Sequence, residues 1–215
     1  MMKNHGLRSI ACGLLIVFSA QTAVAEIRFH GIQVQAGTNY PGIIDDTPDG
    51  VDGTSSASRW GVSAGIHPRF EWGKNILETG LDVHSGTQRF ENDATGEYLD
   101  TDWLEIAVPL TYNFCLFSRG EKGALLEIKL GIAPGYFLPL NTEYSESTGK
   151  PEFQRFFVAP LLGIQLTPIC YGPCRVGIGA STFRSFTKVL DDKVFADEYG
   201  ILSHFSAYLS LDYVF

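Results

Sequence analysis

The chain has 215 residues, 45% of them hydrophobic and 19% charged, and its 24 acidic residues outnumber its 16 basic ones to give a net charge of −8. This acidic balance argues against nucleic acid as a partner, because nucleic acid binds to basic faces. Composition alone allows an ordinary globular domain, so the fold class has to come from the order of the residues.

The N-terminal segment has the features of a secretory signal peptide. Lys3 and Arg8 supply positive charge, residues 10–20 are apolar, and Ala23-Val24-Ala25 forms a cleavage site before Glu26. The apolar run is too short to span a bilayer as a helix, and no long apolar segment follows it. We predict that residues 1–25 are removed and that residues 26–215 form one domain.

Beyond the signal peptide, eight segments alternate between apolar and polar residues with the period of two that an extended strand has. In the clearest of them, Trp60 and Trp72 would lie about 30 Å apart across a tilted strand, which is the spacing of two interfacial aromatic girdles. The eight predicted strands are Ile27–Gly37, Arg59–Trp72, Ile76–Phe90, Asp102–Phe117, Ala124–Leu138, Phe153–Pro168, Arg175–Phe186 and Ile201–Phe215.

Two of these strands have an irregular pattern. The first is consistent with a bulge near Gly31 that switches its faces, and the seventh loses its phase near Phe183. The other segments keep an apolar and a polar face throughout.

The connections between the predicted strands alternate between long and short. Residues 73–75, 118–123 and 169–174 form short turns, whereas residues 38–58, 91–101, 139–152 and 187–199 form long loops. This alternation is typical of bacterial outer-membrane proteins, with turns in the periplasm and loops outside. We predict an all-β, eight-stranded, antiparallel, up-and-down transmembrane β-barrel in the outer membrane. A soluble barrel with an apolar interior leaves the loop pattern and the aromatic girdles unexplained.

Two segments resemble strands of the PorT-like family of outer-membrane β-barrel proteins. Trp103–Tyr112 resembles the strand YLEIPLLLKY, although Ala107 and Val108 move Pro109 two positions later, and Leu130–Leu138 resembles the strand aGpyvgyll. The resemblance implies the fold and the compartment. Because members of that family differ in function, it implies no activity.

The charged residues on the polar faces predict an ionic core that closes the barrel. The interior of an eight-stranded barrel is just wide enough for side chains, and opposite charges within it should pair across strands. A narrow channel is the alternative. The basic residues of this predicted core are Arg59, Arg69, Lys129 and Arg155, and the acidic ones are Glu78, Asp82, Glu105 and Glu127.

The first two predicted long loops, residues 38–58 and 91–101, are acidic, and we predict that they form a solvated rim. Carboxylate oxygens there could hold divalent cations that bridge lipopolysaccharide, but the spacing does not fit an EF-hand, so we assign no metal site and no cofactor. The acidic residues are Asp45, Asp46, Asp49, Asp52, Glu91, Asp93, Glu97, Asp100 and Asp102.

One pair of residues suggests catalysis. His204 and Ser206 share a face of the last strand, and small outer-membrane lipid A deacylases use His and Ser close together on a late strand. Here that face points into the barrel, away from lipid, and no Gly-x-Ser-x-Gly motif occurs. We therefore predict no catalytic residue and no enzyme, with a lipid-modifying enzyme as the alternative.

The three cysteines of the mature domain lie at the periplasmic ends of their strands. Cys170 and Cys174 bracket one turn, and the oxidising compartment favours a disulfide between them. Cys115 is a competing partner for this bond, and the spacing of Cys170 and Cys174 also suits a metal, although no histidine lies nearby in the sequence.

The last strand ends on Phe215, which we expect the barrel-assembly machinery to recognise. Together these patterns predict a monomer surrounded by outer-membrane lipid and lipopolysaccharide. The expected role is structural or interactive, exerted through the acidic extracellular loops.

Overall fold

A computed structural model describes residues 26–45, 54–92, 95–118, 124–145, 151–191 and 200–215, so the predicted signal peptide lies outside the described residues. In these ranges, no helix is long and apolar enough to cross a membrane. The described chain forms strands β1 (Ile27–Asp45), β2 (Thr54–Arg59), β3 (Gly61–Trp72), β4 (Asn75–Thr79), β5 (Leu81–Asn92), β6 (Tyr98–Ala107), β7 (Leu110–Ser118), β8 (Ala124–Tyr144), β9 (Glu152–Phe153), β10 (Phe156–Tyr171), β11 (Cys174–Asp191) and β12 (Gly200–Val214).

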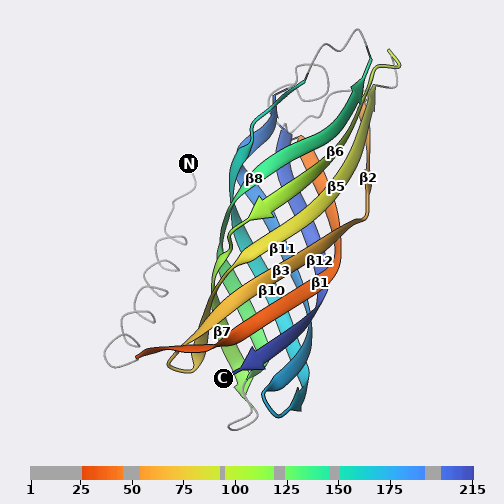
Figure 1. Cartoon of the computed structure of the whole chain (residues 1–215). Helices are drawn as coiled ribbons and strands as arrows, with labels where there is room; N and C mark the ends of the chain where they lie inside the picture. The colour runs from red at the N-terminus through yellow and green to blue at the C-terminus, as the bar shows by residue number, and fades with distance from the viewer. Residues whose placement is uncertain (1–25, 46–53, 93–94, 119–123, 146–150, 192–199) are drawn as a thin grey trace, which may run out of the picture.

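These strands pair antiparallel in one sheet that closes on itself (Figure 1). Starting from β1, the ring runs through β3, then β4 and β5, then β7 and β6, and on through β8, β10 and β11 to β12. The closing pair joins β12 to β1 along their whole shared length, from Gly31 opposite Val214 to Asp45 opposite Gly200. The predicted fold class, an antiparallel transmembrane β-barrel, is confirmed.

Several of the twelve strands continue one another across short breaks. Single residues, Trp60 and Gly80, separate β2 from β3 and β4 from β5, and two residues separate β9 from β10. Val108 and Pro109 separate β6 from β7, where the proline has no backbone N–H to donate to a ladder. Twelve strands with these breaks are compatible with the eight predicted from the sequence.

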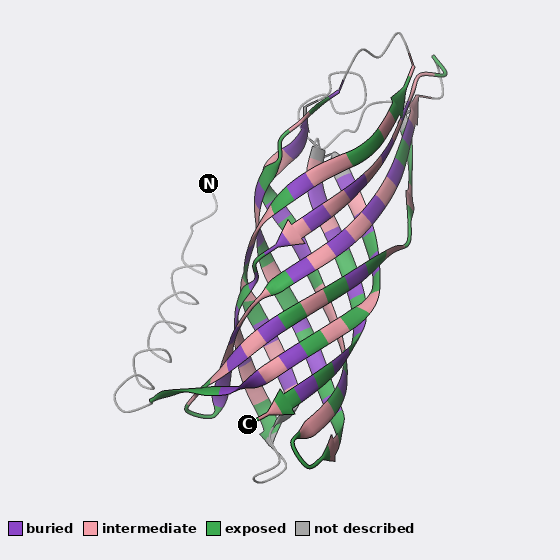
Figure 2. Cartoon of the chain, viewed as in Figure 1, coloured by how far each residue is buried: buried purple, intermediate pink, exposed green. Residues whose placement is uncertain are grey.

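Buried and exposed residues alternate along the strands (Figure 2). Unlike in a soluble protein, many of the buried side chains are polar and most of the exposed large ones on the wall are apolar. Charged side chains such as Arg69 and Glu127 are buried, whereas Val62 and Leu209 are 67% and 64% exposed on the outer wall. At one end of the barrel Tyr40 packs on Trp60, and at the other end Trp72 packs on Tyr112. An apolar outer wall between two sets of aromatic residues is what a bilayer requires.

The two ends of the barrel differ. Residues 73–74 and 172–173 turn the chain at one end, with Gly73 and Gly172 at φ of 64° and 59°, and we call this the short-turn end. The other end carries the longer connections, and we call it the long-loop end. The predicted bulge in the first strand is confirmed at the short-turn end, because the register of β1 shifts between Phe29 and Gly31 and places both His30 and Gly31 inside.

At the long-loop end, the strands extend further than predicted and the ring divides into two sheets. Strand β1 pairs with β3 only as far as Asn39 opposite Gly61, and β8 pairs with β10 only as far as Tyr136 opposite Phe156. Beyond these pairs, β2, β5, β6 and β8 form one sheet, and β9, β11, β12 and β1 form the other. Much of the predicted long loops is therefore strand.

The two gaps between these sheets, which we call the β1–β2 seam and the β8–β9 seam, are bridged differently. At the β1–β2 seam the Gln88 side chain accepts a hydrogen bond from the Ile43 backbone N–H at 2.5 Å and donates one to the Ile43 carbonyl at 3.0 Å. This buried amide replaces the ladder bonds that Ile43 lacks on that side. At the base of the β8–β9 seam, the Phe137 N–H donates to the Arg155 carbonyl at 2.5 Å.

The predicted loss of phase in this strand is confirmed, but it begins after Phe183. Phe183 and Ser185 are buried and Thr182, Arg184 and Phe186 are exposed, so alternation holds to that point. Beyond it the register of β11 against β12 shifts between Arg184 and Lys188 and again before Leu190, and the consecutive residues Val189 and Leu190 are both buried.

One glycine tests how tightly the interior is filled. Gly86 faces the fully buried ring of Trp103, and a Cβ at Gly86 would overlap atoms of that ring. We predict that Gly86→Ala lowers the free energy of unfolding by about 1–3 kcal/mol, the usual cost of overpacking. Urea unfolding in detergent micelles, followed by tryptophan fluorescence, measures this loss.

The matched control is Gly42→Ala, because the nearest atom to its added Cβ is the Ser58 Oγ at 3.6 Å. Its unfolding midpoint should stay at or above that of the wild type. Equal midpoints for the two variants would contradict the packing of Trp103 against the wall.

Candidate functional site: the barrel interior

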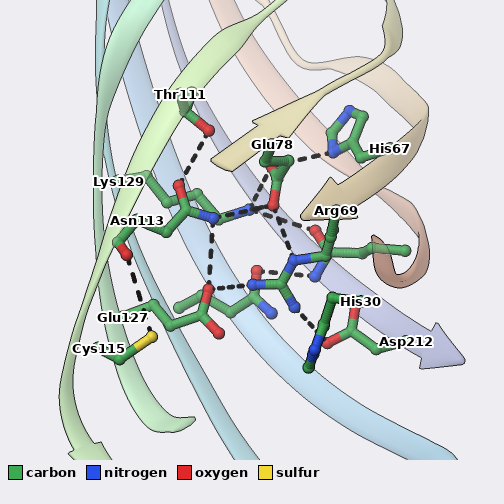
Figure 3. Close-up of polar contacts among 12 residues, drawn as sticks. His30, His67, Arg69, Glu78, Thr111, Asn113, Cys115, Glu127, Lys129 and Asp212 are labelled. Carbon is green, nitrogen blue, oxygen red and sulfur yellow. Dashed lines mark hydrogen bonds and ion pairs between the residues drawn. The ribbon is translucent and has the colours of Figure 1, made fainter. Parts of the chain in front are cut away.

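The short-turn half of the interior is organised around one arginine (Figure 3). Arg69 of β3 is 1% exposed, and its guanidinium contacts three carboxylates from three other strands. Nε lies 3.2 Å from Glu78, Nη1 donates to Asp212 at 3.0 Å, and Nη2 pairs with Glu127. A planar fork of donors suits such a cross-strand role, because it holds several carboxylates at fixed angles.

Lys129 supplies the second positive charge of this cluster. Its Nζ donates to both oxygens of Glu78, at 2.8 and 3.1 Å, and to Gln33 at 3.2 Å. The same ammonium lies 5.7 Å from the centre of the Tyr208 ring. The Glu78 carboxylate therefore contacts two cationic side chains, Arg69 and Lys129.

Imidazole and amide groups contact further oxygens of the cluster. His67 lies between two carboxylates, with Nε2 2.8 Å from Asp82 and Nδ1 3.2 Å from Glu78. The Asn113 amide donates to Glu78 at 3.0 Å and to Glu127 at 3.4 Å. We call Arg69, Lys129, His67 and their four carboxylates the ionic cluster. Each of these carboxylates contacts a basic side chain, which is the condition for burying such charges.

The predicted ionic core is confirmed in part. Arg69 and Lys129 pair with Glu78 and Glu127 as expected. Arg59 and Arg155, however, are exposed, and each follows or precedes a break in its strand at the long-loop end. Their prediction as interior residues is wrong because the breaks at Trp60 and at residues 154–155 interrupt the alternation beside them, so neither side chain keeps the lumenal phase of its strand.

The other half of the interior is apolar, so the prediction of a polar interior along the whole barrel is wrong. Trp103 stacks near Phe137, Phe137 on Phe153, and Phe157 on Phe183, with ring centroids 5.5–5.7 Å apart. These rings occupy the lumenal phase of their strands near the long-loop end. The buried residues of this apolar plug are Ile43, Phe90, Leu99, Trp103, Ala107, Ala133, Phe137, Phe157, Ala159, Phe183, Val189, Leu190 and Leu202.

A signal for the apolar plug exists in the sequence. Phe137, Phe157, Phe183 and Leu202 all occupy polar-phase positions of their predicted strands, and all lie towards the long loops. Within a single strand, an apolar residue at a polar position looks like an interruption of the alternation. Reading them together at one height of the barrel identifies a second, apolar layer.

A histidine pair lies where the two halves meet. His204 Nδ1 is 3.1 Å from the Glu105 carboxylate. The centroid of the His204 ring lies 4.3 Å from that of His84 and 3.7 Å from that of Phe183. Glu105 also accepts a hydrogen bond from the Trp103 indole at 2.8 Å. Glu105 was expected to pair with a basic side chain of the core, and its partners are instead a histidine and an indole.

The predicted lumenal position of His204 and Ser206 is confirmed, since they are 4% and 1% exposed inside the barrel. Within the described structure the Ser206 hydroxyl has no hydrogen-bond partner, and His204 faces Glu105 instead. The two residues thus form no nucleophile–base contact, which a catalytic serine requires.

The predicted disulfide at the β10–β11 turn does not form, and neither does one to Cys115. Cys174 is opposite Tyr171, and Cys170 is opposite Arg175. Successive positions along a strand point to opposite faces, so the side chains of Cys170 and Cys174 leave opposite sides of the sheet. A disulfide would need the hairpin to change its register.

The acidic rim lies only partly in the described structure. Asp46, Asp49, Asp52 and Asp93 fall outside the described residues. Glu91 pairs with Arg89, and Asp102 accepts a hydrogen bond from Thr87 at 2.6 Å. Across the described ranges no group of His, Cys, Asp or Glu side chains is arranged to hold a metal ion.

Comparison with solved structures identifies the class. No protein-family model and no curated protein matches the chain. The outer membrane protein OprG from Pseudomonas aeruginosa matches 87% of this chain and 97% of its own with a TM-score of 0.50 and 12% identity. The outer membrane protein AlkL, in lipid bilayers, covers 87% and 90% with a TM-score of 0.48 and 12% identity. Ail of Yersinia pestis, in complex with the heparin analogue sucrose octasulfate, covers 87% and 99% with a TM-score of 0.42 and 17% identity.

The fold, the inverted burial and the likeness to OprG define the chain as a small outer-membrane β-barrel. Within that class it is a barrel whose interior is ionic in the short-turn half and apolar in the long-loop half. A specific relationship to the PorT-like family stays a prediction.

The ionic cluster makes a prediction for stability. Arg69→Gln leaves Glu78, Glu127 and Asp212 buried without their shared cation, and removing one partner of a buried ion pair costs about 3–5 kcal/mol. We expect a loss of this size in urea unfolding of the barrel, read by the change in gel mobility between folded and unfolded forms.

Arg28→Gln is the control, because Arg28 pairs with Glu26 at 2.7 Å on an exposed surface, where both side chains are more than 70% accessible. Its unfolding midpoint should match that of the wild type. A similarly small effect for Arg69→Gln would show that the ionic cluster does not stabilise the fold.

Proposed function

We propose that the chain is a closed outer-membrane barrel that does not conduct and acts through its long-loop end, which faces outside the cell. The observation that carries this proposal is the filling of the interior by two successive layers. The ionic cluster occupies the short-turn half, and the apolar plug occupies the long-loop half.

The apolar plug argues against the narrow channel. Trp103, Phe137, Phe157 and Leu202 are each 0% exposed, so no water reaches them from either end. An ion crossing this layer would lose its hydration without gaining polar partners, at a cost of many kcal/mol. The ionic cluster alone would leave a polar path, and the second layer closes it.

The long-loop end supports an interaction role. Strands extend beyond the aromatic girdle there, as β8 does to Tyr144 and β1 to Asp45. Glu97 and Asp100 add negative charge to this end, together with the acidic residues of the first two loops. The proposed partners are divalent cations and, through them, lipopolysaccharide or another protein.

The outer face of the last strand supports recognition by the barrel-assembly machinery. Leu209, Leu211, Tyr213 and Phe215 are all exposed on that face, and Phe215 packs against Phe29 of the first strand. An aromatic row along the closing strand fits a role in assembly, after which lipid covers it.

A conductance measurement tests the closed barrel. We expect the purified protein, inserted into planar lipid bilayers at 1 M salt, to show no discrete current steps under conditions where a trimeric porin does. Insertion is verified in the same sample by resistance of the barrel to protease. Reproducible unit steps from the protein would overturn the proposal and favour the channel.

A serine substitution tests the enzyme alternative. Ser206→Ala removes a buried hydroxyl that has no partner, so we expect unchanged lipid A and an unfolding free energy within about 0.5 kcal/mol of the wild type. Mass spectrometry of lipid A from cells producing either form measures the first expectation. A lipid A species that disappears only with Ser206→Ala would show that the barrel is an enzyme.

A further inference from the structure

The β8–β9 seam contains a hollow on the flank of the barrel. It has a volume of about 360 Å³ and lies between the upper part of β8 and the chain around β9. Among the described residues, the last backbone hydrogen bond that crosses the seam at its base is the one from the Phe137 N–H to the Arg155 carbonyl, and strand pairing between β8 and β10 ends at Tyr136 and Phe156. The lining residues are Pro139, Leu140, Thr142, Tyr144, Pro151, Phe153 and Arg155.

The walls of this hollow combine an aromatic surface with polar groups. Tyr144 is 38% exposed and presents ring surface and hydroxyl, while Phe153 packs its ring on Phe137 of the apolar plug and is thereby held in place. Thr142 lies on the same side as Tyr144, with its hydroxyl 3.3 Å from that of Thr101 on β6. Aromatic faces with a few hydroxyl groups beside them suit a sugar, which has apolar ring faces and polar edges.

Arg155 is the charged group of the hollow. Its side chain is exposed and has no hydrogen-bond or ion-pair partner among the described residues. By contrast, the exposed Arg28 and Arg89 pair with Glu26 and Glu91. An unpaired guanidinium is well suited to hold a phosphate by two parallel hydrogen bonds.

The height of the hollow in the membrane narrows the choice of ligand. Its base is the pair Tyr136 and Phe156, which are exposed on the outer wall and belong to the aromatic girdle of the long-loop end. Arg155 follows immediately above Phe156 in this direction. Groups just above an aromatic girdle meet lipid headgroups, so the ligand would come from the membrane surface and not from bulk water.

We propose that the hollow of the β8–β9 seam binds the phosphorylated sugar headgroup of the outer-leaflet glycolipid, lipid A. Arg155 binds a phosphate of the headgroup, and Tyr144 and Phe153 pack against the sugar. The inference rests on the proposed placement of the long-loop end outside the cell, and it gives that end a lipid partner separate from the acidic loops.

Binding of defined lipids tests this site. The full mature barrel in detergent micelles is titrated with diphosphorylated lipid A, with the same lipid after removal of its phosphates, and with phosphatidylglycerol, and native mass spectrometry counts the bound lipids. We expect tight one-to-one binding of the phosphorylated lipid A. Arg155→Gln should weaken it about ten- to a hundredfold, the loss expected for a charge-assisted hydrogen bond, and Tyr144→Ala should weaken it severalfold.

The matched control is Arg59→Gln. Arg59 is also exposed and without a partner among the described residues, but it lies at the β1–β2 seam, so this variant should bind lipid A as the wild type does. Equal losses for Arg155→Gln and Arg59→Gln would overturn the site and leave only attraction to positive charge. Equal affinity for phosphatidylglycerol, or for lipid A without phosphates, would overturn the assignment of the ligand.

The outcome is separable from that of the conductance experiment. Current steps with intact, Arg155-dependent lipid A binding would overturn the closed barrel and keep the site. Silent bilayers without such binding would overturn the site and keep the closed barrel. Each variant is checked for its heat-dependent gel mobility, so that loss of folding is not read as loss of binding.

Discussion

The structure depends on the rule that a backbone in hydrocarbon has to satisfy all its hydrogen bonds within the protein. The ring of pairings from β1 round to β12 meets this requirement across the membrane, and the closing pair leaves no free strand edge there. Both places where the ring divides lie at the long-loop end, beyond Asn39 and Tyr136. Water or side chains are available at that height to bond the freed groups, as the Gln88 amide does for Ile43. The position of the seams thus follows from where the bilayer ends.

Because the outer wall faces hydrocarbon, polar side chains have to point inward, where buried charges need partners. The two halves of the interior meet this requirement differently. In the short-turn half, the charges are retained and paired, with Arg69 holding carboxylates from three strands. In the long-loop half, the lumenal positions are aromatic or aliphatic and need no partners. The His204–Glu105 pair lies between these layers, and His204 is the partner of the Glu105 carboxylate next to the apolar plug. The lumen is thus filled by two layers of different chemistry along the barrel axis.

Much of the fold could be predicted from the sequence because a period of two, the turn residues and the loop lengths are local signals. The faces of Arg59–Trp72, the bulge near Gly31 and the inward position of Arg69 and Lys129 all follow from alternation. Alternation states that two faces differ, but not that the lumenal face changes character along the barrel axis, so it does not reveal the apolar layer to which Phe183 belongs. Alternation also does not show where a strand breaks, and the breaks beside Arg59 and Arg155 put both side chains outside instead of in the lumen. The expected disulfide does not form because of the strand register. Cys174 lies opposite Tyr171, one residue from Cys170, so the two cysteine side chains point to opposite faces of the sheet.

The pairing of β12 with β1 has a consequence for how the barrel can form. Strand β12 lies between β11 and β1, so the last strand in the sequence completes both the penultimate ladder and the closure of the ring. Until it arrives, β1 and β11 each present an unpaired edge of more than ten residues, and such edges recruit other chains. The ring cannot nucleate from one end and grow to completion, because its most distant segments along the chain have to meet before any edge is protected. In the unassembled chain these two edges stay exposed together, so the tendency to aggregate ends only when the first and last strands pair.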